Sequence, residues 1–316
     1  MTVTMPEAFG RRLHRIVGAE STACILARIS SPRPLAVRVH GDDADVRSVL
    51  EELDAGGFLP SPVEWCPRAF LLGGGDRSTV QELDSFRSGR LWIQSLSSMS
   101  AVTALEVQSG HDVLDLCAAP GSKTSMIGAA QHGQGILVAN DRSRQRLFKL
   151  RATLERFGLD RVEITCAPGE SYGASHPDCF DRVLVDAPCS GEGMLHESDP
   201  AGLSQWSEGR IRRLARQQGG LLTAGLRTLR PGGCCIYSTC TYAPEENEVV
   251  VDRILRKMGD EFELEAIPCA MPQGMPGLTE WNDRSLRADM THCLRLLPGI
   301  DPGLTGFFIA RIRRRS

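Results

Sequence analysis

The sequence lacks several patterns that would place it quickly in a class of protein. No run of its 316 residues approaches 18 consecutive apolar positions, so we expect no membrane-spanning helix. The first 18 residues have no apolar core of a secretory signal. None of the 11 cysteines belongs to a Cys-x-x-Cys pair and the seven histidines show no ligand spacing, so no metal site is expected. The cysteines are expected to be reduced thiols, which indicates a cytoplasmic protein.

The overall charge does not point to a nucleic-acid partner, but its distribution leaves that open. Lysine and arginine number 36 against 39 acids, a net charge of −3. A local basic face can still hold phosphates, although solvated helix faces or a charged tail explain any single cluster equally well. Arginines cluster at 11–15, 142–151, 210–216 and 311–315.

The pattern of apolar residues divides the chain near residue 90. Residues 1–90 predict a small α+β domain, and residues 91–316 predict a second, larger domain. The elements expected in the first domain are helices at 5–18 and 43–57 and strands at 34–40 and 63–72.

From about residue 110, strands and helices alternate. This alternation predicts a mostly parallel sheet covered by helices on both faces. In such sheets ligands bind at the carboxyl ends of the strands, where the motifs described below fall. The expected strands are 112–119, 135–141, 162–167, 181–188, 233–240, 262–268 and 306–312, and the expected helices are 122–131, 143–158, 207–230 and 244–259.

The first two strand ends favour a nucleotide-type cofactor. The loop DLCAAPGSKT (115–124) follows a strand and opens a helix, where backbone N–H groups are exposed beside the positive end of a helix dipole. It matches neither Gly-x-Gly-x-x-Gly nor the phosphate-binding Gly-x-x-x-x-Gly-Lys-[Ser/Thr] loop. The next strand ends in AND (139–141), where Asp141 could accept hydrogen bonds from a ribose or could cap the following helix.

Two further strand ends each carry a cysteine. VDAPCSGEG (185–193) ends a strand at Asp186 and continues to Cys189, and IYSTCTYAPEEN (236–247) places Cys240 where another strand stops. If these strands are neighbours, both thiols face one cleft. The other cysteines are interpreted as core residues: Cys24, Cys66, Cys166, Cys179, Cys234, Cys235, Cys269 and Cys293.

Together, DLCAAPGSKT, VLVDAPCSGEG and YSTCTYAPEENE resemble the RNA 5-methylcytosine methyltransferases. VEWCPRAF, LWIQSLSSMSAV and GFFIARIRR are similar to the bacterial 16S ribosomal RNA branch of that family. The resemblance implies a Rossmann-like class I methyltransferase with a mostly parallel seven-stranded sheet, preceded by a small RNA-binding or accessory domain. That branch often carries a further C-terminal RNA-binding domain. This chain stops where the catalytic domain is expected to end. RNA selection is therefore expected to depend on the N-terminal domain, the cleft or a partner.

The resemblance also implies roles for the residues at the strand ends. Cys240 is the expected nucleophile towards carbon 6 of cytosine, Cys189 assists release, and Asp186 holds or protonates nitrogen 3 of the ring. In the DNA enzymes the nucleophile would correspond to Cys189, and Cys240 is favoured here because Thr-Cys-Thr is the signature of the RNA family. The residues expected to bind S-adenosyl-L-methionine are Cys117, Ala118, Ala119, Pro120, Gly121, Ser122, Lys123, Asp141, Arg146 and Asp186.

One position departs from the family pattern. Where the family usually has Asp-Gly after the third strand, this chain has Pro168 before Gly169, so weaker cofactor binding is expected unless Glu170 replaces the acid. Ribosomal RNA or the small ribosomal particle is the expected partner. The alternatives are a transfer RNA enzyme, a catalytically weak ribosome-assembly factor, or a small-molecule or DNA methyltransferase.

Overall fold

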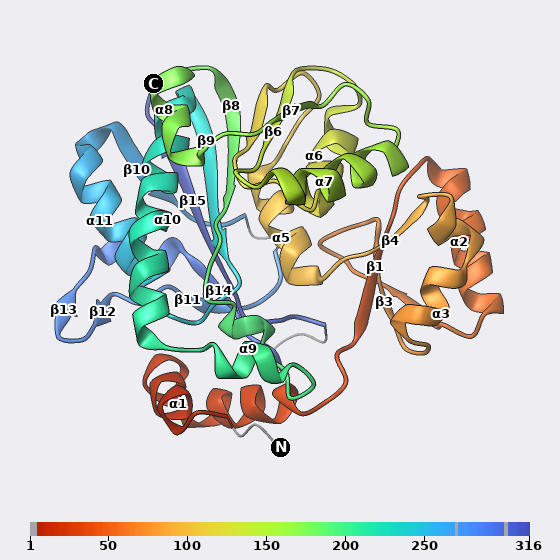
Figure 1. The fold of residues 1–316 in the computed structure, drawn as a ribbon, viewed down its shortest axis with the longest axis horizontal. Helices are drawn as coiled ribbons and strands as arrows, with labels where there is room; N and C mark the ends of the chain where they lie inside the picture. Colours follow the sequence, from red (N-terminus) through yellow and green to blue (C-terminus); the bar gives the residue numbers. More distant parts are fainter. Residues whose placement is uncertain (1–4, 269–270, 300–302) are drawn as a thin grey trace.

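The computed structural model of the chain describes residues 5–268, 271–299 and 303–316 (Figure 1). Cys269 lies outside these ranges. The elements of the N-terminal part are α1 (Glu7–Ile29), β1 (Leu35–Val39), α2 (Asp43–Ala55), β2 (Pro60–Pro62), β3 (Ala69–Leu72), α3 (Arg77–Glu82), α4 (Asp84–Arg87) and β4 (Leu91–Ile93).

The remainder of the chain alternates strands and helices and ends in a series of short strands. Its helices are α5 (Leu96–Leu105), α6 (Ser122–Gln131), α7 (Arg144–Arg156), α8 (Tyr172–Ser175), α9 (Pro200–Ser204), α10 (Glu208–Thr228) and α11 (Glu248–Met258), with 3-10 turns η1 (Gly169–Ser171), η2 (Glu192–Met194), η3 (Gly259–Glu261) and η4 (Ala288–His292). Its strands are β5 (Val113–Asp115), β6 (Leu137–Asn140), β7 (Glu163–Thr165), β8 (Phe180–Asp186), β9 (Leu229–Thr239), β10 (Phe262–Glu265), β11 (Met275–Pro276), β12 (Glu280–Trp281), β13 (Arg284–Ser285), β14 (Leu294–Leu296) and β15 (Phe307–Arg314).

The large sheet has the order β11-β14-β15-β9-β8-β5-β6-β7, and β10 also pairs with β15. Strands β5 to β9 pair in parallel, whereas β15 runs antiparallel to β9, β14 and β10. The sheet therefore has nine strands within the described residues rather than the seven expected. The two additional strands are β11 and β14, which lie on the far side of β15 from β9.

Period-two alternation explains how the sheet is covered on both faces. Along β8, Val183 and Val185 belong to the core cluster formed with α10 and α11, whereas Leu184 points to the opposite cluster formed with α5. Helix α7 closes the second face through Leu147 and Leu150. The core thus lies in two layers, and the carboxyl edge of the sheet is left for the loops that follow β5, β6, β8 and β9.

The N-terminal part consists of a small separate sheet and a helix, α1, that packs elsewhere. Its four strands form a second sheet in the order β2-β3-β1-β4, which places β4 with residues 1–90 rather than with the segment after them. Helix α1 lies apart from this sheet, beneath α9 (Figure 1), and its Phe9 and Leu13 pack in one cluster with Leu195, Leu203 and Tyr242. The division of the chain into two domains at residue 90 stays a prediction.

Several element boundaries differ from those expected. The helix expected at 5–18 extends to Ile29 through a break at Gly18, which has φ +79°. Of the strand expected at 63–72, only Ala69–Leu72 forms, because 64–68 make a turn. The helix expected at 244–259 begins at Glu248, because 244–247 form a turn with backbone bonds from Glu246 to Ala243 and from Asn247 to Pro244. That turn belongs to the site.

Candidate active site

Cys189 and Cys240 lie just beyond the carboxyl ends of two adjacent parallel strands. Asp186 at the end of β8 is in register with Ser238 of β9, so the two chain segments leave the sheet side by side. The two Sγ atoms are 3.2 Å apart, and the backbone N–H of Cys240 donates to Sγ of Cys189 at 3.3 Å. Both side chains are partly exposed. The two thiols therefore share one site that solvent can reach.

The contact between the thiols is electrostatically unequal. A hydrogen bond from the Cys189 thiol to the Cys240 sulfur lowers the pKa of Cys240. The same hydrogen bond, together with burial, raises the pKa of Cys189 well above its ordinary value. The pair thus favours a thiolate at Cys240 and a proton at Cys189. Since the thiolate is the nucleophilic form of cysteine, the lowered pKa of Cys240 favours it over Cys189 as the attacking sulfur.

Asp186 connects the two cysteines to the loop at the start of α6. Its Oδ2 accepts a hydrogen bond from Nζ of Lys123 at 2.8 Å, and its Oδ1 accepts one from Oγ of Ser238 at 2.7 Å. The Lys123 ammonium also lies 5.6 Å from the centre of the Phe307 ring. Both members of the ion pair are largely buried, so solvent screens their attraction less than that of a surface pair. Two motifs 63 residues apart in the sequence are thereby joined at one edge.

Glu246 fixes the two cysteine loops against each other. Its Oε1 accepts hydrogen bonds from the backbone N–H of Ser190 at 2.9 Å and from Nε2 of Gln218 at 2.8 Å. Its Oε2 accepts a further bond from the Ser190 hydroxyl, which also lies 2.8 Å from Oγ1 of Thr241. Burial raises the pKa of Glu246 to about 7. The residue after each cysteine is thus tied to one buried carboxyl group.

Glu192 is a second buried carboxyl group beneath the same loops. Its Oε1 accepts a hydrogen bond from the Trp206 indole at 2.7 Å. Its Oε2 accepts bonds from Oγ1 of Thr241 at 3.0 Å and from the backbone N–H of Tyr242 at 3.2 Å. Burial raises the pKa of Glu192 as well. The Cys240 loop is therefore held from two sides.

Glu248 and Arg295 form a buried ion pair that stabilises the end of this loop. Nε and Nη2 of Arg295 donate to the two oxygens of Glu248 at 2.6 and 2.5 Å, and Nη1 donates to the carbonyl of Tyr242 at 3.0 Å. Neither side chain is more than 2% exposed. Sequence reasoning missed Glu192, Glu246, Glu248 and Arg295 as site residues. The helix expected at 244–259 would place these two acids, Glu246 and Glu248, in its solvated first turns.

The loop after β5 closes tightly around a glycine. Gly121 has φ +107°, and a Cβ added there would lie 2.9 Å from Cδ1 of Leu150 and 3.1 Å from Cβ of Thr153. Only glycine fits this position. The backbone N–H of Ala118 donates to the carbonyl of Asn140 at 2.7 Å, which holds the loop against the end of β6. Helix α6 starts directly after the loop, so the first N–H groups of the helix face this edge.

Asp115, the last residue of β5, is buried behind this loop. Its Oδ2 accepts a hydrogen bond from Oγ1 of Thr124 at 2.7 Å. Burial raises the pKa of Asp115 to about 7, and its Oδ1 has no hydrogen-bond partner among the described residues. Asp115 was not among the residues expected to bind a ligand. Its place at the end of the first strand was the available signal.

Asp141 and Arg146 lie together at the end of β6. The cap of α7 is Ser143, so Asp141 does not cap that helix, and its Oδ1 instead accepts a bond from the N–H of Ser143 at 2.9 Å. Nη1 of Arg146 lies 2.9 Å from Oδ2 of Asp141, and Nη2 of Arg146 donates to the carbonyl of Ala119. Arg146 thus joins the expected ribose-binding acid to the expected cofactor loop.

Asn140 ties three neighbouring strand ends together. Its Nδ2 donates to the carbonyls of Leu116 and Ala167, both at 3.1 Å, and its Oδ1 accepts from the N–H of Ala167 at 3.0 Å and from Oγ1 of Thr165 at 3.2 Å. The amide therefore fixes the spacing of β5, β6 and β7 at their carboxyl ends. The sequence motif AND (139–141) did not reveal this structural role of Asn140.

Glu170 does not take the place of the missing family acid. Pro168 precedes the turn η1, and its carbonyl accepts hydrogen bonds from the backbone and side chain of Ser171. A Cβ added to Gly220 of α10 would lie 3.1 Å from Cγ of Glu170, so this side chain lies against α10. It lines a groove there with Arg216 and Arg227. The departure at Pro168 is therefore not compensated by its neighbour.

The remaining cysteines and arginines divide into several environments. Cys66, Cys234, Cys235 and Cys293 are buried as expected, whereas Cys24 and Cys179 are only partly buried and Cys166 is exposed, so the core assignment was wrong for Cys166. The arginine cluster at 311–315 is largely neutralised, because its side chains pair with Asp178, Glu106, Glu261, Glu263 and Glu265.

No group of three or more His, Cys, Asp or Glu side chains among the described residues is arranged to hold a metal ion. No helix within the described ranges is long and apolar enough to cross a membrane.

Comparison with known sequences and structures agrees with this geometry. A family model described as 16S rRNA methyltransferase RsmB/F matches residues 102–313. Ribosomal RNA small subunit methyltransferase F of Vibrio campbellii is 34% identical over 317 residues, which cover 99% of this chain and 64% of that protein. The protein of the same name from Aeromonas hydrophila is 35% identical and covered to 64%. The chain thus spans a little under two thirds of the length of these relatives.

Solved structures match over nearly the whole chain. A crystal structure of a methyltransferase homologue from Pyrococcus horikoshii has a TM-score of 0.84 and 30% identity, with 99% of this chain and 96% of that chain covered. The crystal structure of NSun6 from the same organism with SFG has a TM-score of 0.82 at 21% identity, with both chains fully covered. The predicted fold class, a Rossmann-like class I methyltransferase, is confirmed.

Proposed function

The chain belongs to the 16S rRNA methyltransferase RsmB/F family, and we propose that it transfers a methyl group from S-adenosylmethionine to carbon 5 of a cytosine in RNA. The observation that carries this proposal is the pair of thiols 3.2 Å apart at the ends of β8 and β9. Carbon 5 of cytosine is a poor nucleophile. A thiolate that adds to carbon 6 turns the ring into an enamine, and carbon 5 can then attack a methyl group.

The residues around β5 and β6 fit the cofactor. Oδ1 of Asp115 is a buried oxygen with no hydrogen-bond partner in the described part of the chain, so it can accept a bond from a ligand. Oδ2 of Asp141 is buried and lies 2.9 Å from Nη1 of the half-exposed Arg146, a partner that a ligand can displace. Residues 117–123 would hold the methionine end and Asp141 the ribose hydroxyls, with Arg146 beside them. When bound, S-adenosylmethionine supplies an electrophilic methyl group on a sulfonium.

Cys240 begins the reaction. Its thiolate adds to carbon 6 of the ring, the 5,6 double bond shifts to the 4,5 position, and the electrons of the bond between carbon 4 and nitrogen 3 move to nitrogen 3, which takes up a proton from solvent. The N–H group formed there donates a hydrogen bond to Asp186. The carboxylate of Asp186 is oriented for this contact by Lys123 and Ser238. A lower pKa raises the thiolate fraction but reduces its intrinsic nucleophilicity, so holding the sulfur and the base in place contributes more than tuning the pKa.

Cys189 completes the reaction. After carbon 5 has been methylated, the proton on that carbon must leave before the Cys240 sulfur can be eliminated as a thiolate. Once Cys240 is bonded to carbon 6 its sulfur is no longer anionic, so the main cause of the raised pKa of Cys189 is removed. Cys189 then loses its own proton to water and accepts the proton from carbon 5.

The RNA is proposed to be 16S ribosomal RNA or the small ribosomal particle, since the family model and the curated relatives carry that description. The target cytosine must leave its stack or come from a single-stranded region to reach the sulfur. Transfer RNA is the alternative substrate. The reduced thiols, which include the unbonded pair at the site, support a cytoplasmic protein.

The proposal is tested by incubating the protein with methyl-labelled cofactor and total RNA, including immature ribosomal particles. We expect label in 5-methylcytosine and in no DNA. If no RNA fraction acquires label in cytosine while the protein binds the cofactor, it would act as an assembly factor without catalysis. Bisulfite sequencing of RNA from cells with and without the protein then identifies the modified position.

Single thiol substitutions test the roles of the two cysteines. Cys189→Ala should accumulate a covalent protein–RNA adduct, seen as a slower band on a denaturing gel, because the proton on carbon 5 is no longer removed. Cys240→Ala should form no adduct and lose methyl transfer. The exposed Cys166 provides the control, since Cys166→Ala should behave as wild type. The opposite pattern in the first two variants would reverse the assignment.

A further inference from the structure

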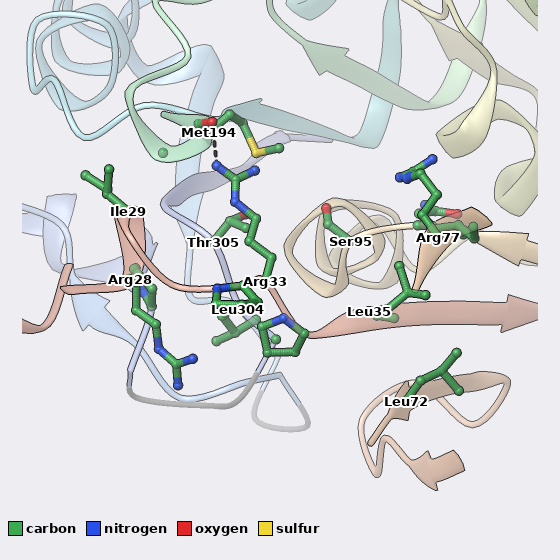
Figure 2. A pocket seen from close by; sticks show the side chains of 18 of the residues that line it. Arg28, Ile29, Arg33, Leu35, Leu72, Arg77, Ser95, Met194, Leu304 and Thr305 are labelled. Carbon is green, nitrogen blue, oxygen red and sulfur yellow. Dashed lines mark hydrogen bonds between the residues drawn. The ribbon is translucent and has the colours of Figure 1, made fainter. Parts of the chain in front are cut away.

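A cavity of about 720 Å³ lies between the N-terminal part and the loop that follows Cys189. Its walls come from the end of α1, the segment that leads into β1, the loop before α3, the start of α5 and the turn η2 (Figure 2). Its volume is in the range of cavities that take a small-molecule ligand. Its polar lining includes Arg28, Arg33, Arg77, Gln94, Ser95 and Thr305, together with Tyr242 and the acids Asp76 and Glu192.

The cavity adjoins the loop that carries the proposed nucleophile. Residues 192–195 form one wall, and the backbone N–H of Gly193 donates to the carbonyl of Cys240 at 3.0 Å. Tyr242, two residues after Cys240, lines the cavity too. A group bound here therefore lies against the backbone segments that flank Cys189 and Cys240.

None of the three arginines of the cavity, Arg28, Arg33 and Arg77, carries a salt bridge within the described ranges. Nη2 of Arg33 donates to the carbonyls of Met194 and Leu195 at 2.5 and 2.9 Å, as Figure 2 shows for Met194, so the guanidinium is held in place by neutral groups. Arg77 is exposed at the first position of α3. Arginine binds phosphate in a bidentate manner, so these two side chains suit a nucleic-acid backbone.

Polar atoms of the lining also await partners. Nε2 of Gln94 and Oγ1 of Thr305 are buried without a hydrogen-bond partner among the described residues. Oε1 of Gln94 accepts a bond from Arg38, which leaves the amide NH2 as a donor. Leu35 and Leu304 supply apolar surface in the same cavity. Hydrogen-bond donors beside apolar walls suit a base removed from its stack.

We propose that this cavity binds one unstacked nucleotide adjacent to the target cytosine. Its phosphate would lie towards Arg33 and Arg77, and its base would lie between the apolar walls. The inference rests on the proposed function. It assigns part of RNA selection to the cavity between the N-terminal part and the catalytic loops.

Filling the cavity tests the inference. Leu35→Trp places a large ring against the base site, and Leu59→Trp is the matched control because Leu59 is 64% exposed and does not line the cavity. With an RNA that the wild type methylates, we expect Leu35→Trp to raise KM for RNA about tenfold or more, the size of one lost base contact. Its dissociation constant for S-adenosylmethionine without RNA should not change. Equal KM values for the two variants would overturn the inference.

A binding assay separates this inference from the proposed function. Oligoribonucleotides with an abasic site on the 5′ or the 3′ side of the target cytosine are titrated into the wild type and into Leu35→Trp. One abasic position should weaken wild-type binding about tenfold and should weaken Leu35→Trp binding far less, because the base has already lost its site. Equal losses in both proteins would refute the cavity assignment even if methylation is observed. An absence of methylation with this pattern intact would refute only the catalysis.

A milder substitution guards against misfolding of the tryptophan variant. Arg77→Gln should reduce the slope of log affinity against log salt by about one, because one phosphate contact is lost. Arg87→Gln, an exposed arginine on α4 that does not line the cavity, should leave that slope unchanged. Identical slopes in the two variants would contradict the phosphate contact.

Discussion

The carboxyl edge of the sheet has a cysteine side, around β8 and β9, and a cofactor side, around β5 and β6. On the cysteine side both oxygens of Glu192, Glu246 and Glu248 accept hydrogen bonds from the protein itself. On the cofactor side Asp115 keeps one buried oxygen without a hydrogen-bond partner in the described chain, and the buried Oδ2 of Asp141 is held by the half-exposed Arg146. The carboxyl groups of one half are thus hydrogen-bonded within the protein, whereas those of the other half have an acceptor left, or one that can be released, for a ligand.

This difference agrees with what each half has to do. A nucleophile must be held in one position before its substrate arrives, because a displacement of about 1 Å costs a large factor in rate. A cofactor that enters and leaves in every cycle needs acceptors that can exchange protein partners for ligand partners. The ion pair between Arg146 and Asp141, with Arg146 half exposed, is of this exchangeable kind.

Breaking the buried ion pair on the cysteine side should give the largest effect. Arg295→Ala leaves the Glu248 carboxylate, 0% exposed, without its cation and frees the carbonyl of Tyr242. We expect a loss of about 3–5 kcal/mol in the free energy of unfolding, measured by urea denaturation. Arg212→Ala, which breaks the exposed pair with Glu208, should cost at most about 1 kcal/mol. Similar losses of unfolding free energy in the two variants would show that the cysteine side does not depend on this buried ion pair.

Stability should depend on pH through one carboxyl group on each side. Glu246 and Asp115 have pKa values raised to about 7 by burial, against ordinary values of 4.5 and 3.8. As the pH rises, each carboxyl group ionises in the unfolded chain before it ionises in the folded protein. The stabilisation that the group contributes is therefore fully present only below its ordinary pKa. That stability is lost as the pH rises to about 7, by at most about 3 kcal/mol for Glu246 and about 4 kcal/mol for Asp115.

Glu246→Gln should therefore flatten the fall in unfolding free energy between pH 5 and 7, and Asp115→Asn should flatten it by a comparable amount. Urea titrations at several pH values measure both effects. If either variant keeps the full slope of the wild type, the carboxyl group concerned is not the source of the pH dependence.

On the cofactor side, Asp141→Ala should weaken S-adenosylmethionine binding about 10- to 100-fold, the size of a lost hydrogen bond to a charged group. Calorimetry without RNA measures this affinity. The control is Arg144→Ala, one residue into α7 and without an ion pair in the described chain. Because the Cys189→Ala adduct is trapped only after methyl transfer, Asp141→Ala should reduce adduct formation and methyl transfer together at limiting cofactor, and excess cofactor should restore both. If excess cofactor restores neither, the two sides do not act separately.

The smallest expected effect is that of Pro168→Asp, which restores the family acid after β7. We expect cofactor binding to tighten by up to about tenfold, because a carboxylate acceptor is regained and Glu170 lies elsewhere, against α10. Glu170→Gln should leave cofactor affinity unchanged. If Pro168→Asp binds the cofactor no more tightly than the wild type does, the loss of the acid is not a weakness of this site.

Much of the cofactor side could be predicted from the sequence, because its signals are local. The helix expected at 122–131 forms over those residues, since a glycine turn and an apolar period specify it within ten positions. Asp141 and residues 117–123 follow their strands directly, so the parallel sheet alone brings them to one edge. The two cysteines are placed by the same rule.

The supports of the cysteine side could not be predicted, because their partners are distant in the chain. Glu246 is held by Gln218, 28 residues earlier, and Glu248 by Arg295, 47 residues later. An acid after a proline is more often a helix start exposed to solvent, and only tertiary packing makes these acids buried acceptors. The extension of α1 beyond Gly18 has the same origin, since its second half packs through Ile25 and Ile29 onto other parts of the chain.

Helix α1 has a consequence for how this protein can be divided. It is the first element of the chain, yet it packs under the loops that carry the chemistry, with Phe9 and Leu13 among its buried side chains. A shortened protein that starts after this helix would leave Trp281 and Leu203 uncovered and would lose the brace beneath Tyr242. A module exchanged between relatives should therefore include helix α1 together with the methyl-transferring portion, although residues 30–112 lie between α1 and β5.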